Sequence, residues 1–293
     1  MPTIREIRRR IRSVKNMAQI TKAMEAVSAS KMRRAQANVL ASRAYAQCMW
    51  RVINDLVDRY TPPDGRPLHP LLSPRPEIRT AALVLVTADR GLCGAYNLEI
   101  IREGVRFIRE QQEKGVAVQV LAVGRRGLDY MRRLGVEVAA ELTKLKDRPA
   151  LVDTQPIAHI LIKDFTEGNI DAAYLAYTEF VNVLVHRPQV RSLLPLLSFA
   201  ERLEGGRVDY IYEPDPITVL SQLLPRYVEV QVYQAILESI ASEHSARMVS
   251  MRNATDNANE LVRELTLSYN KARQAAITKE ITELTGGAAA LEG

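Results

Sequence analysis

The sequence predicts an α/β protein in which long N- and C-terminal helices form an antiparallel coiled coil and a central Rossmann-like domain carries a mostly parallel sheet. Three observations indicate this fold. Two stretches of about 60 residues, one near each end, contain neither Gly nor Pro, the residues that most often interrupt helices. Both stretches carry apolar residues at heptad-like steps. Between them, apolar runs typical of buried strands alternate with helical patterns, which favours parallel strands with right-handed crossovers.

The N-terminal helix is predicted over residues 1–60, because neither Gly nor Pro occurs between Pro2 and Pro62. A helix of this length would extend roughly 90 Å. That is about twice the width of a compact domain of this size, so we expect the helix to project. Its apolar residues recur in steps of three and four, as in a coiled coil: Ile4, Ile7, Ile11, Val14, Met17, Ile20, Met24 and Val27.

The C-terminal helix is predicted within residues 209–286, with neither Gly nor Pro between Pro225 and Gly286. One helix enters the central domain and the other leaves it, so an antiparallel pair is the simplest arrangement. The alternative is that each helix packs flat on a globular core as an ordinary amphipathic helix. The stripe of the second helix follows the same steps: Leu237, Ile240, His244, Met248, Met251, Thr255, Ala258, Val262, Leu265, Tyr269, Ala272 and Ala276.

The central domain is predicted over residues 75–200 as alternating strands and helices. Apolar runs predict strands, and glycines such as Gly124 mark their ends. The Pro-rich segment 61–77 and the segment 201–216 are predicted to link this domain to the two helices. The expected strands are 81–87, 116–123 and 172–177, and the expected helices are 98–113, 126–134 and 154–167.

The positive charge of the chain is concentrated at its N-terminal end. The net charge is +6, but residues 1–34 contain ten basic and two acidic residues, a charge of +8, and the remainder sums to −2. A basic helix can neutralise phosphates, so a coiled-coil nucleic-acid-binding protein is one alternative. No aromatic residue precedes Tyr45, however, so the basic stretch offers no surface on which bases could stack. An acidic protein collar fits a basic rod equally well, and a solvated face without a partner is the third alternative.

An open α/β sheet also invites an enzyme hypothesis, because such sheets bind ligands beyond the carboxyl ends of their strands. The loop 89–97 after the first predicted strand has two glycines, Gly91 and Gly94, without the Lys of a phosphate-binding loop. Cys93 is a candidate nucleophile, but no nearby His supports its activation. The two cysteines, Cys48 and Cys93, are expected to be reduced thiols, and the four histidines show no metal-ligand spacing. We therefore predict no catalytic, cofactor or metal site.

Several segments resemble ATP synthase γ subunits, in order along the whole chain. The run from Ser13 to Met24, which leads into Val27-Ser28-Ala29-Ser30-Lys31-Met32, closely resembles the N-terminal helix of that family. Asp89-Arg90-Gly91-Leu92-Cys93-Gly94 resembles its loop after the first strand, and Tyr210–Pro216 resembles its segment before the last helix. The runs 246–258 and 267–278 resemble its C-terminal helix.

The resemblance implies a non-catalytic central rotor stalk of a proton-translocating F-type ATP synthase, present in one copy per complex. In this family the coiled coil lies inside a ring of three α and three β subunits, and the globular part docks with the ε subunit on the membrane c ring. Rotation of the c ring is coupled to ATP synthesis or hydrolysis at the β-subunit sites. No cofactor and no nucleic acid are implied, and the membrane is reached only through the complex.

The resemblance also implies roles for individual positions. Met24 and Arg247 match positions implicated in coupling, and Arg273, Gln274 and Thr278 match positions thought to contact acidic loops of β. The other matched positions belong to two surfaces: Arg90 and Cys93 in a loop that approaches the helical hairpin of β, and Tyr210, Tyr212 and Glu213 in the foot that meets the c ring and ε. Small residues near the C-terminal end, such as Ala275 and Ala288, would suit a low-friction bearing.

The expected location is the cytoplasmic face of a bacterial cell membrane, as a peripheral subunit. No run of about 18 apolar residues suggests a membrane span. The N-terminus goes directly into charged residues, without the pattern of a secretion signal or an organelle presequence. Chloroplast members of the family carry an inserted segment with a regulatory cysteine pair, and neither cysteine here lies in such an insertion.

Overall fold

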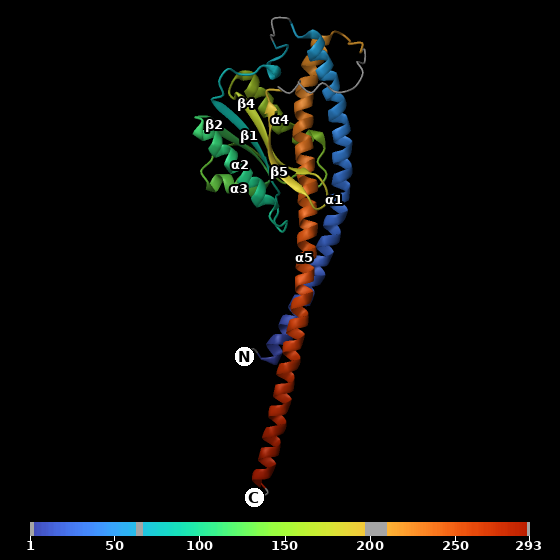
Figure 1. Ribbon diagram of the computed structural model, residues 1–293, viewed down its shortest axis with the longest axis vertical. Helices are drawn as coiled ribbons and strands as arrows, with labels where there is room; N and C mark the ends of the chain where they lie inside the picture. Colours follow the sequence, from blue (N-terminus) through green and yellow to red (C-terminus); the bar gives the residue numbers. More distant parts are fainter. Residues whose placement is uncertain (1–2, 63–66, 197–209, 292–293) are drawn as a thin grey trace. The chain divides into compact units, whose positions relative to one another are not determined.

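The structure, a computed structural model, describes residues 3–62, 67–196 and 210–291, with side chains as far as residue 285 at the C-terminal end. The chain divides into two units. The coiled-coil unit consists of Met1–Ser28 and Arg247–Gly293, and the sheet unit consists of Ala29–Ala246. Two long helices contribute to both units: α1 (Ile4–Tyr60) and α5 (Pro216–Leu291) (Figure 1).

In the coiled-coil unit, the two helices run antiparallel. The hydroxyl oxygens of Thr21 and Thr255 lie 2.7 Å apart, and Arg252 Nε donates to Glu25 Oε1 at 2.8 Å. As residue numbers increase along α1, the numbers of the contacting residues on α5 decrease, so the two helices run in opposite directions. The predicted stripe of α5 is correct here, since Met251, Thr255 and Ala258 are buried. The predicted coiled coil is therefore confirmed.

The predicted stripe of α1 is correct at its start, where Ile7 is buried and Ile4, Ile11 and Val14 are half-buried, but it departs from the structure from residue 17 onward. Met17, Ile20 and Val27 are 59%, 60% and 53% exposed, whereas Ala18 and Ser28 are buried. The prediction followed the bulkiest apolar residues along the helix. From residue 17 onward the helices instead meet along small side chains one position later, which allow two helices to approach closely. The bulky residues then form an exposed apolar ridge beside the seam.

The sheet unit contains five strands in the order β3-β2-β1-β4-β5. Strands β1 to β4 pair in parallel, and β5 runs antiparallel to β4 at one edge. The mostly parallel sheet is thus confirmed. The strands are β1 (Thr80–Val86), β2 (Ala117–Val123), β3 (Val138–Leu142), β4 (Ala172–Phe180) and β5 (His186–Leu194).

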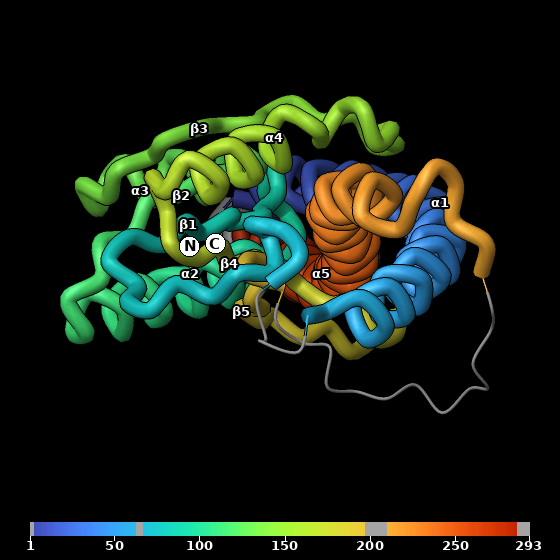
Figure 2. The backbone as a smooth tube through the Cα atoms, turned by 90° about the horizontal axis from the view of Figure 1, so that it is seen from above, coloured from blue at the N-terminus to red at the C-terminus, as the bar shows by residue number. Residues whose placement is uncertain are grey.

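Both faces of the sheet are covered by helices, which explains why β1 reads as an uninterrupted apolar run. Leu83 and Leu85 of β1 pack with α2 (Tyr96–Glu113) and α3 (Arg125–Arg133) on one face. Val84 and Val86 point to the other face, where α4 (Leu151–Glu167) and the helix pair lie. There Leu161 of α4 shares a core with residues of α1 and α5, and Figure 2 shows these two helices side by side.

Strands β3 and β5 were missed by the sequence analysis, and both are edge strands. β3 is short, and its side chains are exposed or half-buried. β5 carries two arginines and Pro188, which cannot donate to a strand ladder and is tolerated at an edge. Edge strands bury only part of their surface and so lack the apolar run by which inner strands are found.

Parts of the predicted linkers lie outside the described residues. In segment 61–77 the structure describes a short 3₁₀ helix, Pro70–Leu72, and leaves 63–66 outside its description. Of the second linker, 201–216, only residues from 210 onward are described, and α5 begins at Pro216. The end of the predicted central domain at residue 200 also lies outside, as do the side chains of Ala288, Ala289 and Ala290.

Candidate functional site

The carboxyl edge of the sheet is where doubly wound folds bind ligands, at the point where strand order reverses. Here that point lies between β1 and β4. Ala88, Cys93 and Tyr96 from the loop after β1 and the start of α2 form a small buried cluster there, against Ala246 of α5. The chain's own helix thus packs against the loop that would cradle a cofactor in a nucleotide-binding sheet.

Hydrogen bonds between side chains and backbone hold the loop after β1. Asn97 Oδ1 accepts from the Ala88 N–H at 2.9 Å, and Asp89 accepts from the backbone N–H groups of Arg125 and Lys144 at 2.9 and 2.8 Å. A carboxylate at the start of α3 also interacts favourably with the helix dipole. Asp89 therefore links the three segments that follow β1, β2 and β3. Its position close after a buried strand could have suggested such a role.

Within this loop, the two predicted contact residues differ in accessibility. Arg90 is exposed, but Cys93 is only 2% exposed and its sulfur accepts from Asn97 Nδ2 at 3.1 Å. Leu92, which the sequence analysis did not select, is 63% exposed and has a φ of 62°. A partner that approaches this loop would therefore meet Arg90 and Leu92, while Cys93 packs beneath them. The same burial argues against Cys93 as a nucleophile.

Asp147 connects this region to the two long helices. Lys31 Nζ of α1 lies 2.7 Å from Asp147 Oδ2, and His244 Nε2 of α5 lies 3.9 Å from Oδ1. The hydrogen bond from Lys31 lowers the pKa of Asp147, and the charges of Lys31, His244 and Arg90 act in the same direction against partial burial. Part of the basic N-terminal stretch thus has an acidic partner within the chain.

Replacing Asp147 by asparagine should lower the free energy of unfolding by less than about 1 kcal/mol, because the half-exposed pair is screened by solvent. The pKa of Asp147 is lowered in the folded chain, so its contribution is present above the ordinary value of 3.8 and is lost as pH falls through the folded-state pKa. Urea unfolding of both chains at pH 7 and at low pH, followed by Trp50 fluorescence, tests this. A difference between the two chains that grows on acidification would contradict it.

The foot residues lie where α1 ends and α5 begins. The Tyr212 hydroxyl donates to Asp55 Oδ2 at 2.9 Å, and burial together with this bond raises the pKa of Tyr212. Tyr212 also contacts the rings of Tyr60 and Tyr210, at centroid distances of 6.4 and 6.0 Å. Tyr210 and Glu213 are exposed, as predicted contact residues should be. Tyr212 instead anchors the group to α1.

Ile211, which the sequence analysis did not select, is 92% exposed at this foot. It lies between the two predicted tyrosines, and an isoleucine between two aromatic residues in a segment outside any strand could have been noticed as a contact residue. It is the most exposed of the large apolar side chains in the described part of the chain.

The five predicted coupling residues belong to the coiled-coil unit. Arg273, Gln274 and Thr278 are exposed on α5, and Met24 of α1 is half-buried. Arg247 is buried to 9% exposure. Beside the exposed trio, α5 also presents an apolar stripe at steps of four and three residues: Ile277, Ile281 and Leu284. This stripe was not predicted, although its helical spacing is readable in the sequence.

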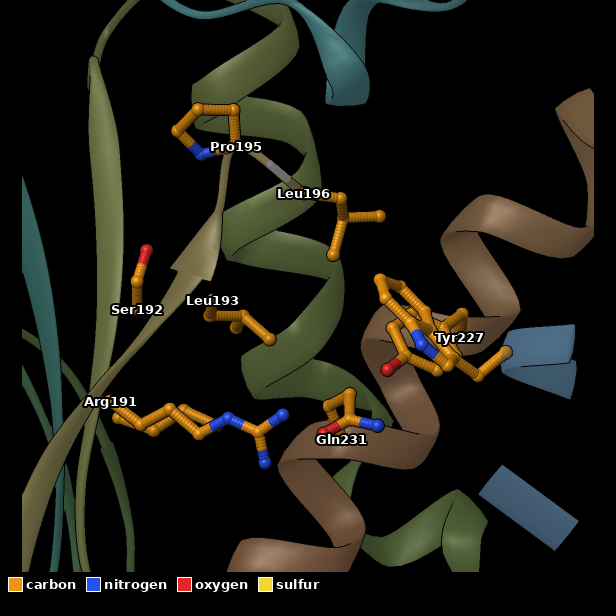
Figure 3. A pocket seen from close by; sticks show the side chains of 9 residues that line it. Arg191, Ser192, Leu193, Pro195, Leu196, Tyr227 and Gln231 are labelled. Atoms are coloured by element: carbon orange, nitrogen blue, oxygen red, sulfur yellow. The ribbon is translucent and has the colours of Figure 1, made fainter. Parts of the chain in front are cut away.

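A cavity of about 270 Å³ lies between β5 and the parts of α1 and α5 that belong to the sheet unit (Figure 3). Trp50 of α1 and Tyr227 of α5 stack at its inner wall with ring centroids 5.3 Å apart. Its polar lining comes from Arg191, Ser192 and Gln231. The cavity combines apolar walls with few polar groups, and the sequence analysis did not predict it.

Within residues 3–62, 67–196 and 210–291, no group of three or more His, Cys, Asp and Glu side chains is placed to hold a metal ion. In the same part of the chain, no helix is both long and apolar enough to cross a membrane.

Comparisons with known proteins agree on one family. The family model described as ATP synthase matches residues 3–291. The ATP synthase gamma chain of Roseiflexus castenholzii is 56% identical over 291 residues, 99% of each chain, and that of Chloroflexus aurantiacus is 54% identical with the same coverage.

Solved structures agree with the sequence relatives. The central stalk and c ring of Tetrahymena thermophila mitochondrial ATP synthase contains a chain that matches with a TM-score of 0.60 and 25% identity, over 80% of this chain and 99% of that one. A chain in a Euglena gracilis mitochondrial ATP synthase structure matches with a TM-score of 0.63 at 19% identity, over 98% and 94%, a likeness of fold. The chain therefore belongs to the ATP synthase family, among the gamma chains of the bacterial type.

Proposed function

We propose that this chain is the central rotor stalk of a proton-translocating F-type ATP synthase and has no catalytic site of its own. In this role it couples rotation of the c ring to ATP synthesis or hydrolysis at the β-subunit sites. Its partners are the α₃β₃ ring, the ε subunit and the c ring, with one copy of the chain per complex. It reaches the membrane only through these partners, as a peripheral subunit on the cytoplasmic face.

The observation that carries this proposal is the surface of the coiled-coil unit. The described residues of this unit are almost all helical, and they expose the ridge of Met17, Ile20 and Val27 on α1 and the stripe of Ile277, Ile281 and Leu284 on α5. Contiguous exposed apolar side chains of this kind favour a surface covered by another protein. Two unequal helices also present different faces to three identical neighbours, so each neighbour takes a different conformational equilibrium.

The individual contact residues are part of the same proposal. Met24, Arg247, Arg273, Gln274 and Thr278 act in coupling inside the ring. The loop with Arg90 and Cys93 approaches the helical hairpin of β through its exposed residues, with Cys93 supporting the loop from beneath. Tyr210, Tyr212 and Glu213 form the foot toward the c ring and ε, where exposure of Tyr210 and Glu213 supports direct contact.

Reconstitution tests the proposed function directly. The purified full-length chain is mixed with α and β subunits of a relative, and the complex is then joined to ε and the membrane part in vesicles. We expect co-assembly, and ATP hydrolysis that pumps protons. Vesicles without the chain are the control. Failure to co-assemble, or tight salt-dependent RNA binding by the chain alone, would count against a rotor.

Substituting Met24 by lysine should weaken coupling, because it adds a charge to a half-buried position on an already basic helix. A lysine can extend its charged end into solvent, so the cost in folding stability should stay below about 1 kcal/mol. The measurement is protons pumped per ATP hydrolysed, with Met24→Leu as the uncharged control of similar size. An unchanged ratio for Met24→Lys would remove Met24 from the coupling surface.

A further inference from the structure

Three buried serines follow one another along α5 at steps of three residues: Ser239, Ser242 and Ser245. They are 2%, 0% and 0% exposed. Serine is a weak helix former, and a buried hydroxyl is costly unless it is hydrogen-bonded. Three buried serine hydroxyls in one helix therefore need hydrogen-bond partners. We call Ser239, Ser242 and Ser245 the serine row.

The partners are backbone groups at the end of β4 and in the turn that follows. The Thr178 N–H donates to Ser239 Oγ at 3.3 Å, and Ser242 Oγ donates to the Thr178 carbonyl oxygen at 3.3 Å. Ser245 Oγ donates to the Val183 carbonyl oxygen at 2.6 Å. Figure 1 shows α5 running along this side of the sheet.

These bonds replace strand pairing that β4 has lost. Its pairing with β1 stops at Ala176, while β4 continues to Phe180. On its other side β4 stays paired with β5 as far as Phe180, so the Thr178 groups that lack a partner are those that face beyond the end of β1. The N–H and carbonyl of Thr178 both find serine hydroxyls on α5 instead.

Another carbonyl of this strand end is bonded from the other long helix. Arg43 Nη2 of α1 donates to the Phe180 carbonyl oxygen at 3.2 Å, and Arg43 Nε donates to Glu238 Oε1 on α5 at 3.1 Å. The end of β4 is thus hydrogen-bonded to both α1 and α5.

Interdigitated apolar side chains already restrict movement of α5 against the sheet. Hydrogen bonds to fixed backbone atoms add a directional requirement for one axial position and one rotation of the helix. A shift of α5 by one residue would turn the serine row by about 100° and leave buried carbonyls without donors. The serine row therefore adds a directional constraint to the apolar packing that holds α5 on the sheet.

We propose that the serine row is the joint through which torque passes between the sheet and the helix pair. This inference rests on the proposed rotor function. It assigns Ser239, Ser242 and Ser245 as positioning residues, which act by holding α5 in register and touch neither nucleotide nor proton path.

The test compares the reconstituted complex under two conditions: ATP hydrolysis without an opposing load, and proton pumping or rotation against one. The Ser239→Ala/Ser242→Ala/Ser245→Ala chain should assemble and hydrolyse ATP as the soluble complex, but should pump severalfold fewer protons per ATP against an imposed gradient. Rotation of a bead attached to the sheet unit should slow more steeply with viscous load than in the unmodified complex. Ser221→Ala is the matched control, since Ser221 is exposed and its hydroxyl donates to the Ile217 carbonyl of its own helix, and it should change neither quantity.

The outcomes separate this inference from the rotor proposal. If the unmodified chain fails to assemble or to pump, the rotor proposal fails regardless of the serine variants. If the unmodified chain pumps and the triple variant keeps the same load dependence, even with a lower melting temperature, the serine row is an ordinary structural contact and the inference is wrong. Should the triple variant not fold, Ser242→Ala alone is measured by the same criteria.

Discussion

Replacing Gly124 by alanine is expected to destabilise the sheet unit by about 4 kcal/mol, which is large for a single methyl group. Gly124 lies between β2 and α3, as the residue that precedes the helix, with φ of 89° and ψ of 143°, a conformation that side chains rarely tolerate. A Cβ there would lie 2.1 Å from the carbonyl oxygen of Thr87, which is backbone and cannot move aside. The clash would fall where the carboxyl ends of β1 and β2 meet.

Urea unfolding of the full-length chain measures this effect through Trp50, the single tryptophan, which stacks on Tyr227 inside the sheet unit. Gly135→Ala is the matched control. Gly135 also has a positive φ, of 71°, but a Cβ there meets no atom within 4 Å, so its cost should be only about 1 kcal/mol. Equal losses for the two variants would show that backbone conformation, without the clash, accounts for the Gly124 effect.

The second large effect is expected from Arg43→Met, at about 3 kcal/mol of lost stability. The Glu238 side chain is 4% exposed, and its Oε1 accepts from Arg43 and from Gln234 at 3.1 Å each. Its Oε2 is buried and accepts no hydrogen bond among the described residues. Removing the guanidinium would leave a buried carboxylate without its countercharge, which is costlier than losing a surface ion pair.

A double variant distinguishes loss of the charge partner from loss of packing. Arg43→Met/Glu238→Leu removes both charges and should recover most of the stability lost in Arg43→Met, because a buried ion pair often stabilises no more than apolar residues of similar size. The same fluorescence-monitored urea unfolding applies. A double variant less stable than Arg43→Met would show that the apolar replacements fit the site poorly and that the buried charge is not the main cost.

The long helices and inner strands could be predicted because their signals are local. The two stretches without Gly and Pro both fall within long helices, α1 and α5, although α5 also continues through Pro225 and past Gly286. An inner strand such as β1 is apolar throughout because both faces are buried. The exposed foot and loop residues came from resemblance to a family. Residue type favours exposed Arg90 over buried Cys93, because free cysteine is among the most often buried residues and arginine is mostly exposed.

The sequence by itself predicted two long helices, one near each end of the chain, that pair with each other. It also predicted that the residues between them form a mostly parallel sheet. Heptad spacing fixes that a helix has an apolar face, whatever covers it. Only the tertiary structure decided which neighbouring positions form the seam, Ala18 rather than Met17, because the phase depends on how closely the partner helix approaches. It likewise decided that α5 covers the carboxyl edge of the sheet and bonds to Thr178, since such contacts join residues that no local pattern connects.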